Sequence, residues 1–510
     1  MIRKRYHLAA FAVVGTLVIA SCGSSSTSSA STTKPTTAGS TAGSATTASS
    51  AATTTVKPTA SSAVDTTGAS VMPTDSSAVS TGSSTVDTKS GSTTPSSTGA
   101  ASTTSSSGAP AKAWTVDTSK CPDPAAAEAP ITGTLTIGSV QPLSGTPAVA
   151  FAPVTDGFKL YLDYANKNKL LNGITLAANI KDDQYDATQT PGAVSSLIDS
   201  KVNIFSGIIG TGDNQAVVDT LNQECIPQLL NLTGAPEWGN VAKYPWTTGA
   251  LVPYDVEARI YATALKGLIG AGGTVGLFTV NNDFGKTFAD AFKKAATASG
   301  LKVVVEQTIE EPDQAPPTNQ VGAIAAAKPD AVMTVPLGLQ CPIFLKELVN
   351  AKAATSGWDP KVFLTNTCAS HLLITLLAAG AGDKVYTSTN ILDPADPANA
   401  ANPGVKAFTD AYAAAGLKGD VGTTAVGWSV AEDTVSILLK AQKAGALSRK
   451  SIIEAARNST FTPSLGIPGA QYKMNGETDG FSFQTLQVEQ WNEATKSFTN
   501  IGTPDSSSES

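Results

Sequence analysis

The chain is 510 residues long and carries a net charge of −7, with charged residues making up only 15% of it. This balance provides neither the basic stripe that nucleic-acid binding needs nor a polybasic surface for lipid headgroups. We therefore expect small molecules or proteins as partners, and no nucleic acid.

The amino terminus has the order of a secretory signal. A basic start at residues 3–5 leads into an apolar run at 8–20, and Ser21 stands directly before Cys22. The run is shorter than the roughly 18 to 20 residues that a membrane-spanning helix needs. The sequence Ile-Ala-Ser-Cys resembles the bacterial lipobox, whose Cys is acylated and becomes the new amino terminus. We expect residues 1–22 to be a lipoprotein signal peptide.

Lipidation of Cys22 would anchor an extracytoplasmic protein to the bacterial cell membrane. The alternative is an ordinary signal peptide that is cut elsewhere and leaves a soluble secreted protein. Both alternatives place the product outside the cytoplasm.

Residues 23–113 are predicted to be a disordered linker. They consist mainly of Ser, Thr, Ala and Gly, and contain no aromatic residue that could help to form a core. A flexible chain of this length has an end-to-end distance of roughly 50 to 60 Å. The composition fits an unmodified tether and an O-glycosylated stalk equally well.

From about residue 131, short β-rich runs alternate with helical segments, which is typical of an α/β chain with parallel sheets. The first series has strands at 135–140, 174–180, 202–209 and 227–232, and helices at 151–169, 190–200 and 215–223. The second has helices at 256–269, 286–299, 318–327 and 343–351, and strands at 275–280, 302–307, 331–335 and 362–364. About 370 ordered residues exceed what one core supports, so two lobes are expected.

The last part of the chain changes pattern. A strand at 385–391 precedes helices near 405–415, 426–444 and 450–457, and residues 470–500 return to a strand pattern that is dominated by aromatic and aliphatic residues.

Apart from Cys22, the chain has four cysteines, at Cys121, Cys225, Cys341 and Cys368. An even number in an exported protein indicates two disulfides, for which three pairings are open. The CxxC and His-rich spacings typical of metal sites do not occur, so no metal or cofactor is expected.

Ligands in such sheets collect at the carboxyl ends of the strands, where loops meet helix amino termini. The loops concerned are rich in hydroxyl and amide groups, and they lie at 141–145, 181–183, 210–214, 231–234, 281–285 and 365–367. Each can also be read as ordinary helix capping.

The sequence argues against catalysis. His7 and His371 are the only histidines, and no GxSxG, HExxH or GxxxxGK[ST] motif occurs. The adjacent Asp182 and Asp183 would point to opposite faces of an extended strand. We therefore expect a protein that is not an enzyme.

A family resemblance rests on an ordered series of motifs. Residues 136–145 (Thr-Ile-Gly-Ser-Val-Gln-Pro-Leu-Ser-Gly) and 155–158 (Thr-Asp-Gly-Phe) resemble the opening of the branched-chain amino-acid (Leu/Ile/Val) binding proteins of ABC importers. Motifs in the same order follow at 182–183, 210–212, 226–228, 243–247, 282–285 and 328–332. The resemblance covers residues 134 to 498.

This resemblance implies a periplasmic-binding-protein type I fold: α/β, with two Rossmann-like lobes whose parallel sheets are joined by three crossovers, near 249–253, 386–392 and 460–468. The chain would then divide into a signal peptide (1–22), a linker (23–113), lobe 1 (114–253), lobe 2 (254–388), the rest of lobe 1 (389–462), the terminal strands of lobe 2 (463–503) and a disordered tail (504–510).

The implied function is that of an extracytoplasmic solute-binding lipoprotein of an ABC importer. It would bind an amino acid or a similar small polar solute in the cleft by hinged closure and present it to the membrane permease, as a monomer without a cofactor. The alternative is a ligand-sensing or surface receptor module of the same fold that is not coupled to transport.

The family's ligand positions fall on loops of both lobes. They are Ser144, Thr211, Gly212, Asp213, Asn214, Leu232, Thr233 and Gly234 in lobe 1, and Phe284, Asn366 and Thr367 in lobe 2. An Asp at 213 would repel a ligand carboxylate unless it faced away. The acidic partner expected for an ammonium falls on Asn366, Thr367 or Cys368. A different amino acid, an amide or another small polar metabolite therefore remains open.

The implied strand order also favours one disulfide pairing. Cys341 and Cys368 follow the strands at 331–335 and 362–364, and neighbouring strands lie about 4.8 Å apart, which suits a disulfide between their end loops. Cys121 would then pair with Cys225. The alternative is free, buried thiols.

Overall fold

The computed structural model describes residues 113–311, 314–502 and 505. The predicted signal peptide with Cys22 and the predicted linker up to residue 112 lie outside the described residues. The predicted tail does so too, except for Asp505, which pairs with Leu486 through two backbone hydrogen bonds of 3.1 and 2.7 Å.

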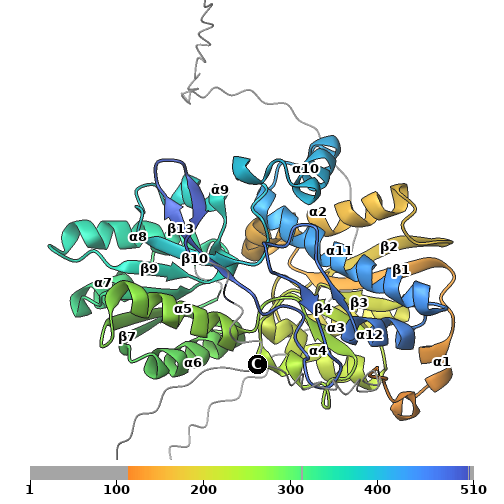
Figure 1. Ribbon diagram of the computed structural model, residues 1–510. Coiled ribbons are helices and arrows are strands. Elements are labelled where there is room, and N and C mark those ends of the chain that lie inside the picture. The colour runs from red at the N-terminus through yellow and green to blue at the C-terminus, as the bar shows by residue number, and fades with distance from the viewer. Residues whose placement is uncertain (1–112, 312–313, 503–504, 506–510) are drawn as a thin grey trace, which may run out of the picture. The chain divides into compact units, whose positions relative to one another are not determined.

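The described chain is α/β with two large separate sheets, as predicted; the first is parallel and the second is mainly parallel (Figure 1). The first sheet has the order β2–β1–β3–β4–β5, and all its strands are parallel. Its strands are β1 (Gly133–Gln141), β2 (Ile174–Asp182), β3 (Ile204–Ser206), β4 (Gln228–Asn231) and β5 (Thr247–Gly249). Helices cover both faces of such a sheet, so its central strands can be apolar throughout.

Alternate residues of these strands pack into different cores. Leu135 and Ile204 join a core with α2 (Gly145–Lys167), α11 (Val421–Ala444) and α12 (Arg449–Arg457). Val140 and Phe205 face the other way, into a core with α3 (Thr190–Asp199) and α4 (Thr211–Gln223). This alternation is the two-residue period of a strand that is buried on both sides.

The second sheet has the order β14–β13–β10–β9–β8–β6–β7. Its strands are β6 (Thr274–Val280), β7 (Lys302–Ile309), β8 (Ala331–Val335), β9 (Lys361–Leu364), β10 (Val385–Thr389), β13 (Gln487–Asn492) and β14 (Ser497–Asn500). The first five of these are parallel, and β13 pairs with β10 and β14 in an antiparallel manner.

The same alternation builds the core of the second sheet. Leu277 and Phe363 pack with α5 (Tyr254–Ile269) and α6 (Asp283–Ala298). Phe278 and Leu364 pack on the opposite face with α7 (Thr318–Ala327), α8 (Gln340–Ala354) and α9 (His371–Leu377). The short helix α1 (Pro124–Glu128) and α10 (Pro403–Ala415) complete the helices of the described chain.

Helices α2 and α11 cross with their backbones in contact. A Cβ atom on Gly157 would lie 1.9 Å from the Thr424 carbonyl oxygen, and one on Gly427 would lie 1.9 Å from that of Val154. Only glycine permits this approach. Helix α11 is thereby fixed to α2, the helix that follows β1.

The chain was predicted to return to lobe 2 at residue 463, but it packs against the core of lobe 1 as far as Leu486. Thr460–Phe461 (β11) and Tyr472–Lys473 (β12) form a hairpin in which the Phe461 and Tyr472 rings stack at 4.5 Å. Tyr472, Phe483 and Leu486 all lie in the first lobe's core. The chain joins the second sheet only at Gln487, so this aromatic cluster holds residues 465–486 on lobe 1.

Two disulfides are present, with the pairing expected from the sequence. Cys121 is bonded to Cys225 with a Cα–Cα distance of 5.6 Å, and Cys341 to Cys368 with 5.7 Å. The first fastens the segment before β1 to lobe 1, and the second joins the loops that follow β8 and β9.

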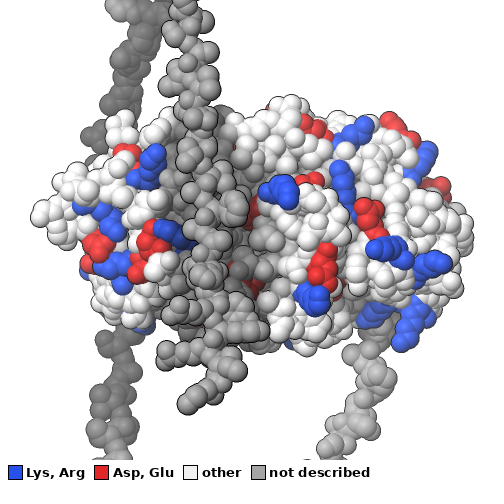
Figure 2. Space-filling view, turned by 90° about the horizontal axis from the view of Figure 1, so that it is seen from above, with Lys and Arg blue, Asp and Glu red and all other residues white. Residues whose placement is uncertain are grey.

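The face of the molecule seen in Figure 2 is mixed in charge. On the face shown in Figure 2, Lys and Arg side chains are interspersed with Asp and Glu. Among the described helices, none combines the length and the hydrophobicity of a membrane span.

Candidate functional site

A pocket of about 250 Å³ lies between loops of the two lobes. It is lined by residues that follow strands or begin helices, as ligand sites in doubly wound sheets are. The lining residues are Tyr185, Asp186, Ala187, Thr211, Gly212 and Asp213 from lobe 1, and Asn282, Asp283, Phe284 and Glu311 from lobe 2.

The start of α4 lines the pocket on the lobe 1 side. Thr211 is buried, and its Oγ1 lies 2.8 Å from Thr233 Oγ1 and 3.3 Å from the Tyr254 hydroxyl. A Cβ atom on Gly212 would lie 3.0 Å from Asp283 Oδ2, so the two lobes come close together here. Glycine at this position keeps the pocket open.

A tight turn after β2 presents Tyr185. Gln184 and Tyr185 both adopt positive φ angles, of 59° and 63°, and Asp183 Oδ1 accepts a hydrogen bond of 3.1 Å from the Tyr185 amide. The ring of Tyr185 stacks on Phe151 with centroids 5.7 Å apart. Non-glycine residues with left-handed backbone are uncommon and are held in place by their surroundings.

Asp213 is buried beside a second carboxyl group. Thr190 Oγ1 lies 2.9 Å from Asp183 Oδ2 and 3.2 Å from Asp213 Oδ1. Burial and the neighbouring Asp183 raise the pKa of Asp213 to about 8, and burial raises the pKa of Asp183 as well. A proton held by the pair relieves the repulsion between two buried carboxylates.

The lobe 2 side is built on the start of α6 and the end of β7. Asn282 caps α6 by accepting a hydrogen bond from the Gly285 amide, and its Nδ2 donates to Glu311 Oε2 at 2.8 Å. Phe284 packs against Tyr254 with ring centroids 5.3 Å apart. Burial raises the pKa of Glu311, and the nearby Asp186 and Asp283 carboxyls raise it further.

The predicted ligand residues thus divide into two groups. Four of them line the pocket: Thr211, Gly212, Asp213 and Phe284. A fifth, Thr233, contacts the pocket residue Thr211 through its hydroxyl group. The remaining predicted ligand residues form hydrogen bonds within their own loops or to neighbouring segments.

In lobe 1, Ser144 is bonded to the Asp182 carboxylate, and Asn214 Nδ2 donates to the carbonyl oxygens of Ile208 and Gly210. The Leu232 amide donates to Ile208, and the carbonyl of Gly234 accepts from the Tyr254 amide.

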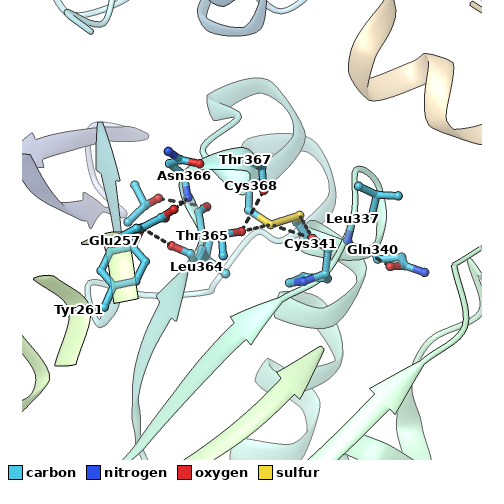
Figure 3. The surroundings of a disulfide bond; sticks show 12 residues. Glu257, Tyr261, Leu337, Gln340, Cys341, Leu364, Thr365, Asn366, Thr367 and Cys368 are labelled. Atoms are coloured by element: carbon cyan, nitrogen blue, oxygen red, sulfur yellow. Dashed lines mark hydrogen bonds between the residues drawn. A yellow bond between two sulfur atoms is a disulfide. The ribbon is translucent and has the colours of Figure 1, made fainter. Parts of the chain in front are cut away.

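Asn366 and Thr367 lie outside the pocket lining, beside the second disulfide (Figure 3). The Asn366 amide donates to Glu257 Oε1 at 2.9 Å, and Thr367 Oγ1 lies 2.9 Å from Thr365 Oγ1. Glu257 comes from α5 and is fully buried, which raises its pKa to about 7. A carboxyl group therefore does stand next to Asn366, but α5 supplies it rather than the loop after β9.

Six of the lining residues were not predicted as ligand-binding residues: Tyr185, Asp186, Ala187, Asn282, Asp283 and Glu311. Asn282 and Asp283 stand in a loop that was singled out. The rule that ligands gather where parallel strands end points to Tyr185 after β2 and to Glu311 after β7.

The carboxyl groups of Asp182 and Asp183 face different partners. Asp182 Oδ1 accepts a hydrogen bond of 2.8 Å from the Leu143 amide, whereas Asp183 faces Thr190. Within residues 113–311, 314–502 and 505, no group of three or more His, Cys, Asp or Glu side chains could hold a metal ion.

Comparison with known proteins gives a family match. The sequence profile described as periplasmic binding protein matches residues 134–496. No curated protein sequence matches the chain.

Similar solved structures share the fold at low sequence identity. A branched-chain amino acid ABC transporter protein from Thermus thermophilus with bound valine is 17% identical, with a TM-score of 0.66, over 74% of this chain and 97% of that one. A fatty acid ABC transporter substrate-binding protein from Thermomonospora curvata is 20% identical, with a TM-score of 0.62, over 76% and 96%. A solute-binding protein from R. palustris in complex with benzoate is 21% identical, with a TM-score of 0.60, over 72% and 96%.

Proposed function

The chain belongs to the periplasmic binding protein family, and on that premise we propose that it is the extracytoplasmic solute-binding lipoprotein of an ABC importer. It captures a small polar solute in the pocket between the lobes, closes around it and presents it to the membrane permease. Cys22 carries the lipid that anchors it. The protein binds its solute without transforming it.

One observation carries this proposal: the pocket takes its lining from both lobes. A solute that contacts both lobes favours the closed form over the open one, and so couples occupancy to shape. The similar proteins hold valine or benzoate, or are described as fatty acid transporters. Solutes of quite different chemistry are therefore accommodated by this fold.

A thermal-shift screen against amino acids, amides, short-chain acids and amines tests the proposal. A solute that binds only the folded state raises the melting midpoint, by about 2.7 kcal/mol of added stability at a concentration a hundred times Kd. Gly212→Leu fills the pocket and should abolish the shift. Gly192→Leu is the matched control, because a Cβ on Gly192, in α3, meets nothing within 4 Å.

Two outcomes would count against the proposal. A shift that survives in Gly212→Leu would place the solute elsewhere. If no solute raises the midpoint while a protein partner binds the ligand-free chain, the receptor alternative is favoured over transport.

A further inference from the structure

The pocket is strongly unbalanced in charge. Four of its ten lining residues carry carboxyl groups, at Asp186, Asp213, Asp283 and Glu311, and none of the ten is Lys, Arg or His. Building on the proposed function, we propose that the solute is an organic cation, an amine or quaternary ammonium, rather than a carboxylate.

Both lobes contribute to this charge. Asp186 comes from lobe 1, and Asp283 and Glu311 come from lobe 2. Asp213, also in lobe 1, adds to the charge once the pH exceeds its raised pKa of about 8. The lobes approach closely at this point, since a Cβ on Gly212, next to Asp213, would lie 3.0 Å from Asp283 Oδ2. Closing an empty pocket brings like charges together, which is unfavourable. A cation between the lobes reverses the sign of this interaction and favours closure.

Helix capping accounts for only half of the acidic residues. Asp213 and Asp283 lie in the first turns of α4 and α6, where a carboxylate is favoured by the helix dipole. Asp186 and Glu311 lie in no helix. Among the described residues, only Asn282 forms a hydrogen bond to the Glu311 carboxyl group, and none does so to that of Asp283. Oxygens that line the pocket are therefore left to accept hydrogen bonds from a ligand.

Two aromatic residues also line the pocket. Tyr185 and Phe284 line the pocket from opposite lobes, each fixed by a second ring, Phe151 and Tyr254 respectively. An aromatic face attracts an ammonium group through its quadrupole, more strongly where water is excluded. Rings together with carboxylates suit an organic cation, and no group of acidic side chains in the described chain is arranged to hold a metal ion.

The raised pKa values fit this picture. Burial and Asp183 raise the pKa of Asp213 to about 8, and burial raises the pKa of Glu311. A bound cation stabilises the ionised carboxylates, so it displaces protons on binding. Deprotonation of Asp213 adds a negative charge to the pocket. The affinity for a quaternary ammonium should therefore increase as the pH rises from 6.5 to 8.5.

Titration calorimetry on the mature chain tests the inference, with choline and 1,4-diaminobutane as cationic probes and leucine, benzoate and Ca²⁺ as comparisons. We expect at least one organic cation to bind and Glu311→Gln to weaken it about tenfold or more. Glu310→Gln is the control and should change affinity less than twofold, because Glu310 is bonded to Asn281 and lies outside the pocket lining. Thermal melting of both variants shows that they fold.

The outcomes separate this inference from the proposed function. If leucine or benzoate binds and the cations do not, or if Glu311→Gln leaves cation binding unchanged, the inference is wrong and the solute-binding function stands. Binding of Ca²⁺ alone would equally overturn the organic cation. If no solute of any class binds, both fail.

Discussion

The pocket residue Asp213 and its neighbour Asp183 make the stability of the protein depend on pH. The two carboxyl groups meet in lobe 1 with Thr190 between them, and the pKa of Asp213 is about 8 against an ordinary value of 3.8. The folded state thus binds a proton that the unfolded state releases. Stability must therefore fall as the pH rises through the window between these two values.

The variant Asp213→Asn should flatten this dependence, because an amide cannot ionise. At pH 4 the variant should be close to wild type in its free energy of unfolding, whereas at pH 8 it should be more stable by roughly 1 to 3 kcal/mol. Urea denaturation at a series of pH values measures this difference.

Asp219→Asn provides the control for this experiment, since Asp219 lies on the same helix and is exposed. Its profile should run parallel to that of wild type. If the Asp213→Asn profile is equally parallel, the carboxyl pair does not hold a proton across this range.

At the scale of elements, α9 and α11 form a link between the lobes. Asp420 caps α11 through Oδ1, which accepts from the Thr423 amide at 2.7 Å. Its Oδ2 accepts from Ser370 Oγ at 2.9 Å and from the Leu372 amide at 3.3 Å, both at the start of α9 in lobe 2. Nearby, His371 Nε2 lies 3.2 Å from Asp393 Oδ2, next to the second crossover.

Removing this link should favour the open form of the ligand-free protein. Ser370→Ala deletes a hydrogen bond that joins lobe 2 to the Asp420 carboxylate of lobe 1, and hydrogen bonds to charged groups contribute about 1.5 to 3 kcal/mol. We expect a larger radius of gyration in small-angle X-ray scattering than for wild type.

A second serine separates closure from general loss of stability. Ser464 Oγ donates to Glu432 Oε2 at 2.7 Å, and both residues belong to lobe 1, so Ser464→Ala should leave the radius of gyration unchanged. Equal scattering curves for Ser370→Ala and wild type would show that α9 does not restrain the lobes.

Elements were the part of the molecule that the sequence predicted best. The alternation of apolar runs and helical segments identified both sheets, because parallel strands buried on two faces are apolar throughout. The starts of the helices were predicted less accurately. Helix α11 begins at Val421 rather than near 426, because Asp420 caps it, and α2 begins at Gly145 rather than 151, because the Asp182 carboxylate holds the preceding turn.

The pocket was harder to predict for a physical reason. Thr211 and Asn214 stand in one turn of α4, yet the first faces the pocket and the second bonds to backbone carbonyls. Sequence spacing places both at a strand end but does not say which way each turns. Tyr185 reaches the pocket only through two consecutive left-handed residues, which no apolar period reveals.

At the scale of the whole molecule, the proposed anchor can be tested directly. Cys22 lies outside the described residues, and its lipidation is a prediction from the sequence. Cys22→Ser should move the protein from the membrane fraction to the medium, because none of the other four cysteines stands in a sequence that resembles a lipobox. Fractionation and mass measurement of the mature amino terminus check this.

Ser24→Ala, two residues further along, is the control and should remain in the membrane fraction. A Cys22→Ser protein that stays with the membrane would show that something other than this cysteine holds it.

Among the described residues, the amino-terminal segment before β1 is fastened to lobe 1. Asn458, just after α12, exchanges two hydrogen bonds with Trp114, of 2.9 and 2.8 Å, and Cys121 is bonded covalently to Cys225. Any tension that reaches Ala113 is therefore borne by lobe 1 and ends at the disulfide. If Cys22 anchors the chain as proposed, we expect a pull on this segment to act on lobe 1 and not directly on lobe 2.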